Sequence, residues 1–395
     1  MKQGLRILMI VVVPLLFTGC EKYSTVEIED GNFLQALIDR GVDTDGDGTI
    51  SFSEAADVKE LNVYYCDIFD LSGLESFVNL ETLRCGDNEF TEIDVSGNTL
   101  LKYLDIEHNK VSKLDLSRNV NLESLITMYN PLTSLDLSEN TALRYLNTES
   151  VPLKNLDISR NIMLTVVNCW GNGLTSLDIS KNTVLEQLNC NSNHLTSLDL
   201  SNNPALEILQ CEYNDLETLD LSENTVLTGL LCSDNELTSL DISGCDQLES
   251  LYCGYNKLSV LDVSDKPLLK RLVCERNQIA SLDLQSSALL QQLLCSVNRL
   301  ESIDVSGCED LSRLECSDNL LTSLNTSNNT ELWQLYCGYN QITTLDLTNN
   351  SKIYQLAIDH MPSLTKVCVW VMPFPPISVY TDGSPNFYFT NDCSK

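Results

Sequence analysis

Apolar and polar residues alternate along this chain in one frame with a 21-residue period. From 80 to 352, thirteen consecutive units follow the frame L-x-x-L-x-C-x-x-N-x-L-x-x-L-D-[LIV]-S-x-N-x-x without insertion or deletion. A strict repeat of this length indicates that each unit is one coil, which buries its apolar face only by stacking on its neighbours. The pattern therefore predicts a solenoid rather than a globular domain.

The period and the leucine positions predict which solenoid this is. Leucines at positions 1, 4, 11 and 14 of so short a unit are typical of the leucine-rich repeat. We predict a right-handed leucine-rich repeat solenoid with a parallel β-sheet on its concave face and little helix, and residues 58–79 as a first, 22-residue rung. Such folds present surfaces and seldom catalyse, so no enzymatic activity is expected.

Two further rows are predicted to face the interior. Asparagine holds position 9 in twelve of the thirteen units, where its amide can bond to neighbouring backbone groups. Cysteine holds position 6 in ten units. Parallel strands about 4.8 Å apart would stack these thiols side by side as small buried hydrophobes, which argues against disulfides and against a zinc site. The ten residues are Cys85, Cys169, Cys190, Cys211, Cys232, Cys253, Cys274, Cys295, Cys316 and Cys337.

Aspartate holds position 15 in twelve units, so neighbouring carboxylates would repel one another. Hydrogen bonds from the serine two positions later and from backbone amides of the next turn would offset this repulsion, and we expect the aspartates to cap turns. A row of bound cations and side chains splayed into solvent are the alternatives.

With its cysteine row, asparagine row and 21-residue period, the segment 80–352 resembles the internalin family of leucine-rich repeat surface proteins, one of which has a cysteine ladder. The resemblance covers the thirteen units, which make up most of the chain. It implies adhesion or ligand capture without naming a ligand.

The first residues predict export and a lipid anchor. Residues 1–19 combine a basic start with an apolar run too short to span a bilayer, which is typical of a secretory signal. Thr18-Gly19-Cys20 resembles the lipobox of bacterial lipoproteins, so Cys20 is the predicted lipidation site; an ordinary cleaved signal is the alternative. Residues 20–31 would be a tether that holds the protein in the bacterial cell envelope, at the outer membrane or cell surface.

Residues 32–57 predict an EF-hand-like cap. The loop 43–54 matches the calcium-binding pattern at every coordinating place, between helices expected at 32–40 and 53–60. We predict a structural Ca²⁺; a calcium-triggered switch and a metal-free loop are the alternatives. The predicted ligands are Asp43, Asp45, Asp47, Thr49, Ser51 and Glu54.

Residues 353–395 predict a C-terminal cap, because a solenoid end exposes an apolar cross-section. Residues 367–371 are expected to form the final strand. Cys368 and Cys393 are candidates for a disulfide that closes the cap.

Composition narrows the partners. A formal net charge of −32 disfavours nucleic acid. Positions 3, 5, 7, 8 and 10 should face outward from the sheet, where aromatic rings and a local group of arginines suit a protein or glycan ligand of a monomeric module. A scaffolding lipoprotein without a specific ligand is the alternative. The candidate binding residues are Trp170, Tyr213, Tyr252, Tyr255, Arg271, Arg276, Arg299, Arg313, Tyr336 and Tyr339.

Overall fold

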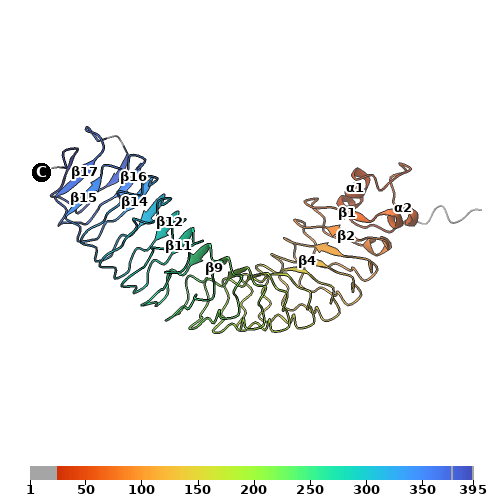
Figure 1. Cartoon of the computed structure of the whole chain (residues 1–395). Coiled ribbons are helices and arrows are strands. Elements are labelled where there is room, and N and C mark those ends of the chain that lie inside the picture. Colours follow the sequence, from red (N-terminus) through yellow and green to blue (C-terminus); the bar gives the residue numbers. More distant parts are fainter. Residues whose placement is uncertain (1–24, 375–376, 394–395) are drawn as a thin grey trace, which may run out of the picture.

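A continuous parallel sheet lines the concave side of an arc-shaped solenoid in the computed structural model, which describes residues 25–374 and 377–393 (Figure 1). Sixteen strands join in the order β1 to β14, β16, β18. Their bounds are β1 (Glu60–Asn62), β2 (Thr82–Arg84), β3 (Tyr103–Asp105), β4 (Ser124–Ile126), β5 (Tyr145–Asn147), β6 (Val166–Asn168), β7 (Gln187–Asn189), β8 (Ile208–Gln210), β9 (Gly229–Leu231), β10 (Ser250–Tyr252), β11 (Arg271–Val273), β12 (Gln292–Leu294), β13 (Arg313–Glu315), β14 (Gln334–Tyr336), β16 (Gln355–Ala357) and β18 (Ser378–Tyr380).

The strands occupy positions 3 to 5 of the repeat. Side chains alternate along a strand, so the leucine at position 4 points inward while positions 3 and 5 point outward. Leu230, Leu251 and Leu272 lie side by side in register, each one repeat after the last, and all three are fully buried. Since no repeat gains or loses a residue, the same register holds from β2 to β14. The predicted leucine-rich repeat solenoid with little helix is confirmed.

The cysteine row lies where it was predicted. All ten position-6 thiols are buried and form no disulfide. Burial raises their pKa, to about 12 for Cys169, so they are neutral thiols at neutral pH. The row acts as a column of small hydrophobic side chains.

Asparagines form two interior rows, not one. At position 9, Asn193 Nδ2 donates to the carbonyls of Cys169 and Cys190, and its Oδ1 accepts from Leu174 N–H. At position 19, Asn182 Nδ2 donates to the carbonyls of Ile158 and Asn161, both in the preceding rung. Each row therefore satisfies backbone groups of the preceding rung as well as joining the rungs.

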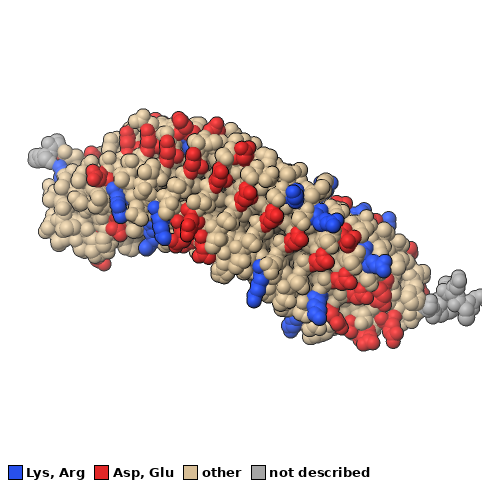
Figure 2. Space-filling model, turned by 90° about the horizontal axis from the view of Figure 1, so that it is seen from below, with Lys and Arg blue, Asp and Glu red and all other residues tan. Residues whose placement is uncertain are grey.

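The position-15 aspartates cap turns, as predicted, and the donor is the predicted residue two positions later, a serine in most rungs. Asp199 Oδ1 accepts the backbone N–H of Ser201 at 3.0 Å, and the same bond recurs along the row. Hydrogen bonds from Ser201 hold the pKa of Asp199 below its usual value although the side chain is exposed. Figure 2 views the convex side, where acidic side chains form a line that runs across the rungs.

The N-terminal cap contains the helices α1 (Gly31–Asp39) and α2 (Phe52–Asp57), and the first rung contains the 3₁₀ turn η1 (Leu74–Ser76). The second predicted helix is wrong at its C-terminal end, because Glu60 already belongs to β1. The cap packs on the first rung: the Phe33 and Phe77 rings lie 6.5 Å apart, and Asn32 Nδ2 donates to Asp67 O.

The predicted tether 20–31 is wrong for its described part. Val26 is buried and its N–H donates to Ile50 O at 2.7 Å, while Asp30 caps α1. The segment from residue 25 onward thus belongs to the cap, because Val26 is buried and its backbone N–H is bonded to Ile50 of the calcium loop. Cys20 and the signal 1–19 lie outside the described residues.

The C-terminal cap is larger than the single final strand predicted. β16 continues the concave sheet as one further rung after the thirteen repeats, in which Met361 replaces the position-9 asparagine and Ser384 Oγ bonds to Met361 N–H and Ile358 O instead. A second sheet is formed by β15 (Thr344–Leu347), β17 (Lys366–Val369) and β19 (Tyr388–Thr390). A disulfide joins Cys368 to Cys393, as the sequence suggested.

Among residues 25–374 and 377–393, no helix has the length and apolar character needed to cross a membrane.

Candidate functional site

The concave sheet presents the predicted aromatic residues in two ways. Tyr252 and Tyr336 lie at position 5, half-buried on the sheet, and Trp170 is half-buried at position 7. Tyr213, Tyr255 and Tyr339 lie at position 8, just after the strands, and are 59%, 44% and 48% exposed. The position-8 tyrosines are therefore the more accessible set.

Position 8 is a structural row of its own. Every residue at this position in the fourteen rungs from Asp87 to His360 adopts a left-handed backbone conformation, with φ between 48° and 67°. This conformation turns the chain at the end of each strand and aligns the side chains along one edge of the sheet. His108 stacks on Tyr129 and His360 on Tyr339, each with ring centroids 4.2 Å apart. His108 and His360 were not predicted as binding residues, although their place at position 8 of the repeat indicates that they face outward.

The four arginines are largely engaged within the chain. Arg313 Nη2 pairs with Glu315 at 2.5 Å, Arg299 donates to Gln278 Oε1 at 2.9 Å, and Arg276 lies over the Tyr255 ring. Arg271 is exposed on β11. The structure thus brings together Arg276 and Tyr255, and the other three arginines lie with separate surroundings rather than as one basic centre.

The concave face also carries a run of apolar side chains that was not predicted as part of the binding surface. Leu231, Tyr252, Val273 and Leu294 hold position 5 of four successive rungs, and only Tyr252 was singled out. Comparing position 5 between repeats would have shown the run, because most other repeats carry polar or charged residues there.

The predicted calcium loop has its acidic side chains gathered at one point. One carboxylate oxygen from each of Asp43, Asp45 and Asp47 lies within 4.8 Å of the others. The Asp43 carboxylate also accepts the N–H groups of Gly46 and Gly48, at 2.7 and 2.9 Å. Both glycines have positive φ, which allows the chain to wrap around this carboxylate.

Glu54 closes the loop from its other end. Its Oε1 accepts from Thr44 N–H and its Oε2 from Ser51 N–H, and the bond from Ser51 leads the causes that lower the Glu54 pKa to about 2. The three aspartate oxygens fit a hard cation, which takes oxygen ligands. Glu54 lies outside that group of oxygens and would have to exchange these bonds to join it. Thr49 donates its backbone N–H and its Oγ1–H to Asp47 Oδ1, and Ser51 Oγ donates to Glu54 Oε2.

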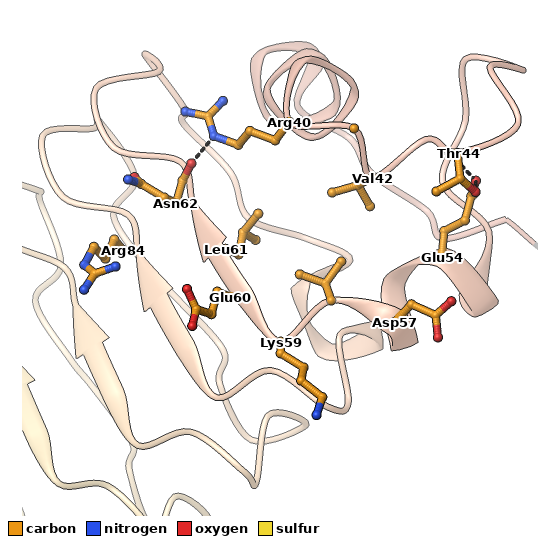
Figure 3. Close-up of a pocket in the computed structure, with 12 residues that line it drawn as sticks. Arg40, Val42, Thr44, Glu54, Asp57, Lys59, Glu60, Leu61, Asn62 and Arg84 are labelled. Carbon is orange, nitrogen blue, oxygen red and sulfur yellow. Dashed lines mark hydrogen bonds between the residues drawn. The ribbon is translucent and has the colours of Figure 1, made fainter.

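A cavity of about 730 Å³ lies between one side of the cap and the first rung (Figure 3). Thr44 and Glu54 line one side, and the guanidinium of Arg84 lies on the other. Arg40 Nε donates to Asn62 O across its upper edge. The loop and the N-terminal end of the concave face are therefore neighbours.

Comparison with solved structures places this architecture among known proteins. The functional domain of InlJ from Listeria monocytogenes, described as including a cysteine ladder, is 34% identical with a TM-score of 0.78, covering 81% of this chain and 70% of that one. The internalin InlF from the same organism is 22% identical, with a TM-score of 0.67 and coverage of 82% and 94%. A leucine-rich repeat protein of Leptospira interrogans is 20% identical, with a TM-score of 0.68 and coverage of 86% and 93%, a likeness of fold.

No family model and no curated protein sequence matches the chain. The InlJ domain nevertheless shares 34% identity over 81% of this chain and is itself described as including a cysteine ladder, and internalin-like repeats of this kind are protein-binding domains. The chain belongs to the internalin family of leucine-rich repeat proteins.

Proposed function

We propose that this protein is a bacterial surface module that captures a protein or glycan ligand through its concave sheet. One observation carries the proposal. The inward positions are nearly invariant and buried, whereas the outward positions differ from rung to rung, and Tyr213, Tyr255 and Tyr339 remain exposed. Varied side chains on an uncovered, rigid sheet are what ligand recognition requires.

The proposed location follows from the predicted signal and the lipobox-like Cys20. A lipid on Cys20 would hold the cap near the membrane and leave the arc projecting away from it. Palmitate labelling of wild-type cells and of cells with Cys20→Ala tests this anchor. Loss of label and release of the variant from the membrane fraction support it, whereas equal labelling refutes it.

A structural Ca²⁺ in loop 43–54 is part of the proposal. Asp43, Asp45 and Asp47 would hold the ion, which would lock the loop against the first rung. Bound calcium at 100 times its Kd would stabilise the fold by about 2.7 kcal/mol. Calorimetric titration and melting with and without chelator test this, with Asp45→Ala expected to abolish the calcium response. Asp39→Ala, an acidic residue outside the loop, is the matched control.

A protein and glycan array tests the binding proposal directly. The chain from Glu21 onward is compared with a variant carrying Tyr213→Ala, Tyr255→Ala and Tyr339→Ala, with calcium present and absent. Tyr388→Ala is the control, because Tyr388 is 59% exposed on β19 of the second sheet. Ligands lost only by the triple variant support the concave face. A blank array, or hits that all variants retain, would favour a scaffolding role.

A further inference from the structure

The centre of the concave face is apolar along one line. Leu231, Tyr252, Val273 and Leu294 pair in register across β9 to β12, so their side chains stand side by side on the outer face of the sheet. All four are half-buried rather than covered. At a strand spacing of about 4.8 Å the line is about 14 Å long. We call these four residues the apolar strip.

The sheet beside the strip lacks a side chain at one buried position. Gly229, at position 3 of β9, has no side chain, and a Cβ there would meet only the Ile208 side chain at ordinary contact distance. Ile208 is itself half-buried and pairs with Gly229. The apolar surface therefore extends from the strip toward β8, where it is formed by the Ile208 side chain and the backbone of Gly229.

One flank of the strip is acidic. Glu212 and Glu275 hold position 7 and Asp234 holds position 8, and all three are half-buried on the side of the strip toward the position-8 edge. Burial is the first cause that raises the pKa of each carboxyl group. A ligand that covers this flank would bury the three groups further, so it must bring positive charge to keep them ionised.

The opposite flank differs in character. Position 3 carries Ser250, Arg271 and Gln292 on β10 to β12. The surface is therefore asymmetric: an acidic side, an apolar line, and a polar side with one exposed arginine.

We propose that the apolar strip binds a protein partner that presents a ridge of aliphatic or aromatic side chains flanked on one side by lysine or arginine. The proposal rests on the proposed function, because it assigns the centre and the ligand chemistry of the same concave face. A helix of about ten residues matches the length of the strip. Aliphatic side chains offer little to sugar hydroxyls, and a second copy of this chain, with its net charge of −32, would be repelled from the acidic flank.

The test is a selection followed by affinity measurements. Phage-displayed random 16-residue peptides are panned against the full chain in the presence of calcium, and enriched peptides are synthesised with a fluorophore. Fluorescence polarisation then gives their Kd for wild type, for the triple tyrosine variant defined above, and for three further variants and one added control. The first carries Val273→Thr and Leu294→Thr, which place β-branched threonine on both strands. The second is Val260→Thr, a control at a valine that is 71% exposed outside the strands. The third carries Glu212→Gln, Asp234→Asn and Glu275→Gln, with Glu223→Gln as its control.

The expected enrichment is of peptides that combine Leu, Ile, Val or Phe with Lys or Arg. The strip variant should weaken them about tenfold or more, and Val260→Thr should leave them unchanged. The carboxylate variant should weaken them and flatten their dependence on salt. Circular dichroism melts establish that each variant remains folded.

Several results would overturn the proposal. No enrichment, enrichment of acidic or purely polar peptides, or peptides that the strip variant binds as tightly as wild type would each do so. Peptides insensitive to the strip variant but lost by the triple tyrosine variant would sink the strip and leave the binding function standing. Peptides that bind the strip variant and the triple tyrosine variant as tightly as wild type would contradict both the strip proposal and the proposed binding function of the concave face.

Discussion

Two sections of the solenoid each lack a different interior row. Repeats 2 to 4 (101–163) have no position-6 cysteine, and Ile106, Thr127 and Thr148 take its place. Repeats 8 to 11 (227–310) have no position-19 asparagine, and Cys245, Lys266, Ser287 and Cys308 stand there. Both sections keep the same strand register. The solenoid therefore tolerates the loss of either row when the other is present.

The two losses differ in kind. Position 6 needs only a small apolar volume, which isoleucine or threonine also fills. Position 19 supplies a donor to two backbone carbonyls of the preceding rung. In repeats 8 to 11 the replacements approach such carbonyls only loosely, with Cys245 Sγ at 3.9 Å and Lys266 Nζ at 3.4 Å. We infer that repeats 8 to 11 are joined by their strands, leucines and cysteines and by the position-9 asparagines, without the second asparagine row.

The largest predicted effect comes from opening the position-19 row where it is intact. Asn182→Ala removes the donor to Ile158 O and Asn161 O and leaves both buried carbonyls with one partner fewer. We expect a loss of about 2 to 5 kcal/mol in the free energy of unfolding. Urea denaturation followed by circular dichroism measures it.

Ser287→Ala is the matched control, because Ser287 holds the same position, is fully buried, and its Oγ has no hydrogen-bond partner. Its effect should be within about 1 kcal/mol of wild type. Equal losses in both variants would show that position 19 matters through packing rather than through its amide.

The interior of this molecule could be predicted from the sequence, and the exterior could not. A repeat of fixed length determines the register, so Leu230 and Cys232 had to be buried. The turn-capping role of the position-15 aspartates and their serine donor were both predicted correctly, since an aspartate such as Asp199 reaches the N–H of Ser201, two residues ahead, before it reaches a neighbouring coil. Which arginines pair depends on side-chain rotamers, and so the repeat pattern did not predict the ion pair between Arg313 and Glu315.

A second prediction concerns a buried charge in repeat 2. Asp105, at position 5, is 6% exposed, and burial raises its pKa to about 6. Asn147 and Asn168 hold position 5 nearby and make the same bond to an N–H two residues on. Asp105→Asn should therefore keep this bond and stabilise the fold by about 2 kcal/mol at pH 7.5.

The sign of the pH dependence follows from the raised pKa. The folded protein carries the cost of the ionised Asp105 above pH 6, and protonation relieves that cost as the pH falls through 6 toward the unfolded value near 4. The gain from Asp105→Asn should accordingly shrink over this window. Asp115→Asn is the control, because hydrogen bonds from Ser117 lower the Asp115 pKa and no such gain is expected. A gain independent of pH would contradict the assignment.

A smaller gain is expected from restoring the row in repeats 8 to 11. The Lys266 side chain is only 3% exposed, and its Nζ lies 3.6 Å from Asp246, whose carboxylate is largely in solvent. Lys266→Asn would place an amide donor toward the carbonyls of Ile242 and Cys245, by analogy with Asn182. We expect a stabilisation of about 1 kcal/mol, measured as a raised urea midpoint. A lowered midpoint would mean that the ion pair with Asp246 contributes more than the asparagine bonds.

The smallest effects separate the two threonines that replace cysteine. Thr127 Oγ1 contacts Asn147 O at 3.4 Å, a weak bond, whereas Thr148 Oγ1 donates to Asn172 Oδ1 at 2.8 Å. In most other rungs that amide oxygen accepts an N–H from position 11 of the preceding rung, but Leu153 N–H donates to Val151 O instead, because Val151 replaces the position-9 asparagine.

Thr127→Cys should therefore be nearly neutral, and Thr148→Cys should cost about 1 kcal/mol by leaving the Asn172 oxygen without a strong donor. Thermal melts of the two variants side by side resolve this difference. Equal and negligible costs would mean that threonine in this section is only a volume substitute for cysteine. A cost confined to Thr148 would show that the cysteine row is interrupted there because a hydroxyl is needed where the asparagine row is itself broken.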